Sequence, residues 1–258
     1  MESYANGSRI MHGTGDDSDV YGNMFYCSED DCIELDGGQM NVRVYNNRME
    51  QSLCGISTAP NMSGPSYIFR NLITDLGTSD NDQTGSVIKA GGSPDKINGV
   101  QYLFNNTFDS PTHIMRNVGY SGLEYHAVTR NNIFISRAEK NALENTTANE
   151  RDDNDYDMIY GKLNIKSDDE SHAVFGFPSY INAENGDYRL KKGSRGIDEG
   201  EIIDNFADSY NGETADMGAF EYGSEVQFMP YRPIDMKADK YRISLKNGQK
   251  KKVTVSLG

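Results

Sequence analysis

The sequence lacks several features that would by themselves define a class of protein. None of its apolar runs reaches 18 residues, so no membrane-spanning helix is predicted. Tryptophan is absent, although 16 tyrosines can supply flat aromatic surfaces in its place. The three cysteines, Cys27, Cys32 and Cys54, form neither a CxxC pair nor an even set. We therefore expect neither a zinc site nor a disulfide framework, and interpret the cysteines as small apolar residues in strands.

Positive charge is also scarce. Lysine and arginine number 25 against 39 aspartates and glutamates, which gives the 258 residues a formal net charge of −14 at pH 7. Such a chain repels nucleic acid and anionic lipid, so we expect neither as a partner.

Only seven prolines accompany 26 glycines, and Asn-Asn and Asn-Gly pairs recur at many junctions. These pairs indicate frequent turns, so we predict an all-β fold.

Five segments repeat one phrase in which apolar residues alternate around an asparagine. The last asparagine of each phrase falls at intervals of 24, 24, 35 and 26 residues, at Asn23, Asn47, Asn71, Asn106 and Asn132. A repeat of this length matches one coil of a stacked solenoid. Asparagine tolerates left-handed backbone, and its amide can hydrogen-bond from coil to coil. We therefore predict that these asparagines occupy equivalent corners and have a structural role.

A second short strand follows each of the first four phrases after about ten residues. These strands are CIEL (32–35), GIST (55–58), SVIKA (86–90) and THIMR (112–116). Two or more short strands in a coil of about 24 residues, without helical periodicity, predict a parallel β-helix.

The order of these phrases resembles a known group of proteins. DDCIELDGG, NVRVYNN, CGISTAP and GPSYIFRNLI follow one another, and FPSYINAENGDYRLKKGSRGIDEG (177–200) and ADMGAFEY (215–222) close the series. They resemble the bacterial secreted right-handed parallel β-helix repeat proteins, which include polysaccharide lyases, pectinases and noncatalytic surface proteins. The resemblance implies a right-handed β-helix over residues 1–223, ending in an NGDYRL strand and a DMGAFEY strand. It also implies a monomer that is extracellular or at the cell surface.

The composition changes after residue 223. Pro230 and Pro233 indicate a linker, and the strand patterns YRISL (241–245) and KKVTVSL (251–257) flank an NGQ turn. We predict that residues 224–258 form a linker and a β-hairpin that resembles the start of an immunoglobulin-like module. A strand pair packed on the β-helix is the alternative.

An acidic stretch, SEDDCIELDGG (28–38), lies in the first coil. Strand alternation predicts one inward column of Ile33, Ile56, Ile88 and Ile114. The next outward row then contains Glu34, Ser57, Lys89 and Met115. At about 4.8 Å per coil, Glu34 and Lys89 lie about 10 Å apart. We expect a polysaccharide to lie along this row.

Three functions remain open for this row. In a polysaccharide lyase, Lys89 would be the base and a cation would neutralise a uronic carboxylate. In a glycoside hydrolase, Asp31 and Glu34, or Asp30 with Asp17 from the preceding coil, would act as the carboxyl pair. Asp30, Asp31 and Cys32 are similar to the DDC of pectinases, whose GHG and RIK phrases are missing here. In the third alternative the face binds a glycan without cleaving it.

Lyase-like chemistry is the leading expectation, with Lys89, Glu34 and Asp31 as catalytic residues. We expect four further side chains to contact substrate, namely Arg70, Arg116, His113 and Ser57. Carboxylate oxygens are the ligands that Ca²⁺ prefers. A calcium site is therefore predicted at Asp30, Asp31, Glu34 and Asp36.

Overall fold

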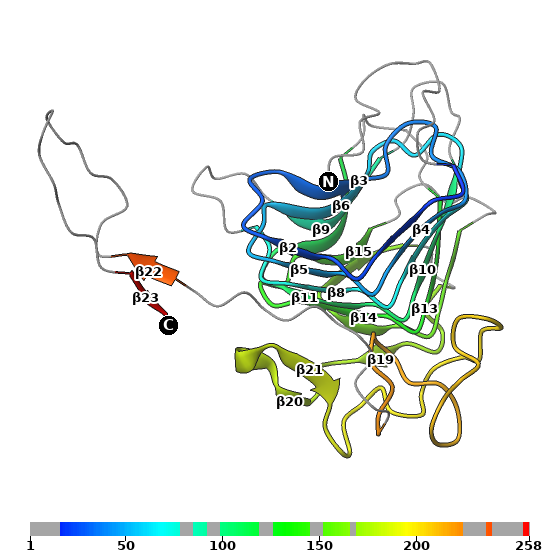
Figure 1. Cartoon of the computed structure of the whole chain (residues 1–258). Helices are drawn as coiled ribbons and strands as arrows, with labels where there is room; N and C mark the ends of the chain where they lie inside the picture. The colour runs from blue at the N-terminus through cyan, green and yellow to red at the C-terminus, as the bar shows by residue number, and fades with distance from the viewer. Residues whose placement is uncertain are drawn as a thin grey trace, which may run out of the picture.

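The protein is a parallel β-solenoid of about five turns (Figure 1). The computed structural model describes residues 16–77, 85–91, 99–118, 126–144, 152–165, 169–223, 236–238 and 255–257. One 3-10 turn, η1 (Ala183–Asn185), is the only helical segment in those ranges. Within them no helix is long and apolar enough to cross a membrane. The predicted all-β parallel solenoid is confirmed.

Three parallel sheets run along the stack, and each of the first four coils contributes one strand to each sheet. Sheet A contains β1 (Asp19–Tyr21), β4 (Val42–Tyr45), β7 (Ser66–Phe69), β10 (Val100–Phe104), β13 (His126–Arg130) and β16 (Asp153–Asn154). Sheet B contains β2 (Met24–Tyr26), β5 (Arg48–Glu50), β8 (Leu72–Thr74), β11 (Thr107–Ser110), β14 (Ile133–Ser136), β17 (Met158–Tyr160) and β19 (Val174–Phe175). Sheet C contains β3 (Asp31–Glu34), β6 (Cys54–Thr58), β9 (Ser86–Ala90) and β12 (His113–Asn117). A further parallel pair, β15 (Asn141–Glu144) and β18 (Lys162–Asn164), completes the strands of the stack.

Alternation of side chains produces the core. In sheet A the inward residues of successive coils are aliphatic, as in Val44, Ile68 and Leu103, and all three are fully buried. Sheet B contributes Met49, Ile73, Phe108, Phe134 and Ile159 to the same core. Each residue lies above the equivalent residue of the next coil. An apolar residue at the same position in every coil therefore produces a continuous apolar column.

The repeated asparagines form a ladder at the corner between sheets A and B. The Asn47 amide donates to Asn71 Oδ1 (3.1 Å), Asn71 donates to Asn106 (3.0 Å), and Asn106 donates to Asn132 (2.8 Å). The predicted equivalent corners are therefore confirmed. The left-handed residue is the one before each ladder asparagine, as in Asn46 (φ 53°) and Asn131 (φ 58°). The ladder residues themselves are retained for their side-chain amides.

The register of sheet C differs from the prediction in the fourth coil. Ile33, Ile56 and Ile88 align, but the residue opposite Ile88 is Met115, one position beyond Ile114. Both Ile114 and Met115 are fully buried. Two consecutive residues face the core in β12, so the position of Ile114 in the sequence does not by itself determine the register of this strand.

Residues 177–223 cover the outer face of sheet B. They include an antiparallel hairpin, β20 (Tyr180–Asn182) and β21 (Asp187–Leu190), which contains the predicted NGDYRL strand. Leu190 and Met217 pack against Ile133, Ile135 and Met158 of sheet B. The phrase DMGAFEY forms bends, not the expected strand, because its backbone bonds to side chains and loops of the solenoid.

Near the end of the chain, β22 (Met236–Ala238) pairs antiparallel with β23 (Val255–Leu257). β23 lies within the predicted strand 251–257, whereas its predicted partner, 241–245, lies outside the described residues. The immunoglobulin-like module therefore remains a prediction.

Candidate functional site

The outer face of sheet C carries the candidate row. Glu34 aligns with Ser57, Ser57 with Lys89, and Lys89 with Arg116. The row therefore changes from acidic to basic along the stack. Arg116 takes the place that the sequence-based register gave to Met115, because the whole fourth strand is shifted by one residue.

A break in side-chain alternation brings Asp31 onto this face. Cys32 and Ile33 are consecutive and both belong to the core, as do Val87 and Ile88. Two inward residues in succession interrupt strict alternation, so Asp31 emerges on the same side as Glu34. There Asp31 Oδ2 accepts a hydrogen bond from Lys89 Nζ. The Asp31 side chain is 1% exposed and that of Lys89 is 26% exposed, so this ion pair is largely removed from water.

Asp36 joins the cluster from the turn after β3. Its Oδ1 accepts hydrogen bonds from Ser57 Oγ (2.8 Å) and from the backbone N–H of Ala59 (2.8 Å). Ser57 itself is fully buried. Its hydroxyl positions Asp36, and its burial does not suit the ligand contact expected from the sequence.

Burial and mutual repulsion alter the protonation of the carboxyl groups. Partial burial and the charges of Asp36 and Asp31 raise the pKa of Glu34. Burial also raises the pKa of Asp36, although the bonds from Ser57 and Ala59 oppose this. For Lys89, burial lowers the pKa, but the hydrogen bond and charge of Asp31 outweigh it and the net shift is upward. Lys89 is therefore an ammonium ion at neutral pH.

His113 lies at the other end of the face, opposite Ser86 of the preceding coil. Its Nδ1 accepts a hydrogen bond from the backbone N–H of Asn141 (3.2 Å). Burial, Arg116 and Lys140 lower its pKa. The imidazole is therefore neutral at pH 7, with its proton on Nε2, and can donate one hydrogen bond.

Arg70 does not belong to this face. It occupies the left-handed corner between β7 and β8 (φ 53°), and its Nη2 donates to the backbone oxygen of Phe206 (2.9 Å). The sequence suggested substrate contact because Arg70 is a basic residue in a repeat phrase. The structure instead uses it to hold residues 177–223 against the solenoid.

The predicted calcium ligands are only partly assembled. Asp30, Asp31 and Asp36 all lie close enough to Glu34 to raise its pKa. However, the described residues contain no group of three or more His, Cys, Asp or Glu side chains arranged to hold a metal ion. The nearest cation to Asp31 is the ammonium of Lys89. Calcium binding at this face therefore stays a prediction.

The residue that ends the asparagine ladder, Asp157, was not predicted from the sequence. Asp157 Oδ1 accepts from the backbone N–H and side-chain amide of Asn132 (2.6 and 2.8 Å), and Asp157 Oδ2 accepts from Thr129 (2.6 Å). Its own N–H donates to buried Glu170 (3.3 Å). The signal was present, because NDYDMIY repeats the phrase 25 residues after Asn132 with aspartate in place of asparagine.

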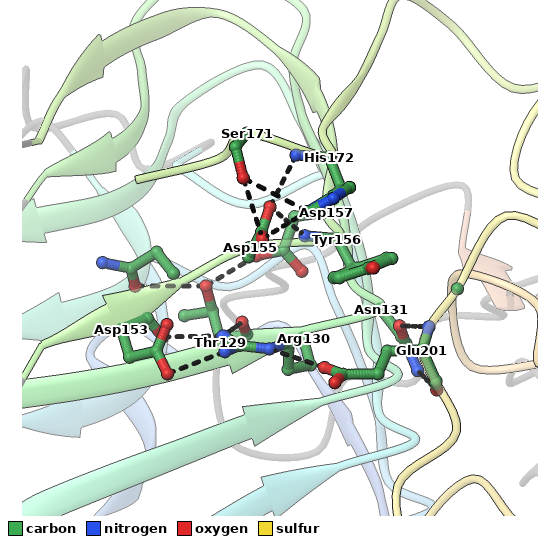
Figure 2. A network of polar contacts seen from close by, with 12 residues as sticks. Thr129, Arg130, Asn131, Asp153, Asp155, Tyr156, Asp157, Ser171, His172 and Glu201 are labelled. Carbon is green, nitrogen blue, oxygen red and sulfur yellow. Dashed lines mark hydrogen bonds and ion pairs between the residues drawn. The ribbon is translucent and has the colours of Figure 1, made fainter. Parts of the chain in front are cut away.

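A serine, a histidine and an aspartate meet beside this ladder (Figure 2). His172 Nδ1 lies 2.7 Å from Asp155 Oδ2 and 3.2 Å from Ser171 Oγ. A catalytic triad needs opposite ring nitrogens for the acid and the nucleophile. Here one nitrogen meets both groups, so the cluster does not have the geometry of a nucleophilic site. Asp155 accepts from the backbone N–H of Tyr156 and of His172, which gives it a structural role in the last coil.

Comparison of the chain with protein-family models, curated proteins and solved structures gave no match. The class that the coordinates define is therefore the parallel β-solenoid. Any narrower assignment depends on the chemistry of the residues described above.

Proposed function

We propose that the outer face of sheet C binds a polysaccharide and hydrolyses it, with Glu34 as general acid and Asp36 as general base. The observation that carries this proposal is the position of two carboxyl groups of raised pKa beside the Asp31–Lys89 ion pair. A raised pKa favours the protonated form of a carboxyl group, which can deliver its proton to a leaving oxygen.

Glu34 ends β3 and Asp36 lies in the turn after it, close enough that the charge of Asp36 raises the pKa of Glu34. This pairing of two separate carboxyl groups motivates hydrolysis with inversion. Inverting glycosidases keep their carboxyl groups about 6.5 to 9.5 Å apart, which leaves room for a water molecule. Ser57 and Ala59 both donate to Asp36 and so favour its ionised form. Asp36 is thus the better base, and Glu34 the better acid.

Elimination, the leading expectation from the sequence, has weaker support. A lysine that abstracts a proton must be neutral. Asp31 holds Lys89 as an ammonium ion. In the proposed hydrolase, Lys89 instead orients Asp31, while Arg116 and His113 contact sugar units farther along the stack. A polysaccharide substrate implies a location outside the cell or at the cell surface.

The test is an assay of the whole chain against a panel of neutral and acidic polysaccharides. Saturated reducing ends that disappear in Glu34→Gln and Asp36→Asn would support hydrolysis, and Glu29→Gln, an exposed acid outside the row, is the matched control. Ultraviolet-absorbing unsaturated ends that disappear in Lys89→Met would show elimination instead. Binding without either product would show that the face is a glycan-binding surface.

A further inference from the structure

A separate cavity of about 290 Å³ lies between sheet B and the segment that covers it. One wall comes from the solenoid and contains Glu50, Asp75 and Arg137. The other wall comes from η1 and the β20–β21 hairpin and contains Ala183, Glu184, Gly186 and Tyr188. The cavity is on a different sheet from the candidate hydrolase face, so it does not depend on that proposal.

The polar character of this cavity is local. Along the outer row of sheet B, Glu50 aligns with Thr74, Thr74 with Asp109, and Asp109 with Ile135. Where the row is apolar, at Ile135, the covering segment packs into it as a closed hydrophobic cluster. Where the row is polar, the same segment leaves a hollow. The contact between the covering segment and sheet B therefore changes, within one row of side chains, from close apolar packing to a polar cavity.

Two ion pairs hold the polar groups in place. Arg48 Nε and Nη2 contact Glu50 Oε1 at 2.7 and 2.6 Å, and both side chains are below 10% exposed. Arg137 contacts both oxygens of Asp109 (2.6 and 2.7 Å). Buried ion pairs are often no more stabilising than apolar residues of the same volume. A contribution to stability therefore does not by itself explain why these two ion pairs lie beside the cavity.

We propose that this cavity binds a neutral sugar unit. Carboxylates accept hydrogen bonds from sugar hydroxyl groups, and the guanidinium of Arg137 donates to hydroxyl or ring oxygens. The ring of Tyr188 and the methyl group of Ala183 supply apolar contact. Three carboxylates and one guanidinium give the lining a formal charge of −2, which disfavours uronic acids. The volume is near the lower limit of ligand pockets, roughly 300 Å³, and suits one or two sugar rings.

The test is titration calorimetry of the whole chain with cellobiose, N,N′-diacetylchitobiose, digalacturonate and the diamine putrescine. We expect a neutral disaccharide to bind. Ala183→Phe, which fills the cavity, should weaken binding at least tenfold. Glu184→Ala removes a polar group from an exposed turn and should also weaken it, which guards against misfolding of the first variant. Glu29→Gln, an exposed acid outside both this cavity and the sheet C face, should leave binding unchanged.

Three results would overturn the proposal. They are the absence of binding by any probe, binding of putrescine or digalacturonate in preference to the neutral disaccharides, and neutral binding that survives both cavity variants. Neutral binding that is lost in Glu34→Gln but kept in Ala183→Phe would assign the sugar to sheet C.

Discussion

Asn132 donates two hydrogen bonds, from its backbone and its side chain, to a single oxygen of Asp157. Every earlier rung of the ladder uses an amide that both donates and accepts. The Asp157 side chain only accepts, and the backbone N–H of Asp157 donates to the buried Glu170. Burial, followed by the charge of Asp157 and the hydrogen bond to it, raises the pKa of Glu170.

This pair predicts a pH dependence of stability. Glu170 binds its proton more tightly in the folded state, so the free energy of unfolding falls as pH rises above the ordinary glutamate pKa of about 4.3. The slope for one such group is at most about 1.4 kcal/mol per pH unit. Glu170→Gln should remove that slope, and we expect the variant to be more stable than the parent at pH 8. Urea unfolding at pH 5 and pH 8 measures this, and equal slopes in both proteins would contradict it.

The ladder itself predicts a gradient of mutational cost. The Asn106 side chain donates to Asn132 and Ile68 and accepts two bonds from Asn71. At about 1 kcal/mol for each buried hydrogen bond, Asn106→Ala should cost roughly 4 kcal/mol. Asn23→Ala removes only two partly exposed donor bonds and should cost roughly 1 kcal/mol. Chemical denaturation compares them, and equal costs would argue against the ladder.

The Asp31–Lys89 pair should show strong energetic coupling. Lys89→Met leaves the buried carboxylate of Asp31 without its ammonium partner. The loss of one partner from a buried ion pair should lower the free energy of unfolding by about 4 kcal/mol. Asp31→Asn in the same chain should recover much of that loss, because it removes the charge. A double-mutant cycle of unfolding free energies measures the coupling. Additive single-variant costs would mean that the two groups are not paired in solution.

Calcium provides a further test of the acidic face. If the four predicted ligands, Asp30, Asp31, Glu34 and Asp36, bind the ion, millimolar calcium should raise the melting temperature by mass action. Asp36→Asn should reduce the increase, whereas Asp75→Asn, an acid at another corner with left-handed backbone that asparagine tolerates, should not. An identical melting temperature in calcium and in chelator would leave Lys89 as the cation of this site.

The repeat spacing was sufficient to predict the fold, because a stacked coil repeats its side chains at fixed intervals. It also identified Asn47, Asn71, Asn106 and Asn132 as equivalent. The break in alternation at Cys32 and Ile33 could not be predicted, since both residues are apolar and a single sequence does not show where alternation stops. For the same reason, the predicted register of Met115 and Arg116 differs by one position from the observed register. Long-range contacts such as that of Arg70 with Phe206 depend on how residues 177–223 return across the sheets, which no local pattern records.

That return changes how the molecule responds as a whole. In a simple solenoid each coil touches only its neighbours, so the ends can fray independently. Here Asn105 bonds to Asp216, Asn131 to Glu201, and Arg70 to Phe206, across separations of 111, 70 and 136 residues. Opening one coil of the solenoid therefore also disturbs the segment that holds the others. We expect hydrogen exchange of the strands in the stack to follow a single cooperative unit, with uniform protection from β4 to β14 in place of a gradient from either end.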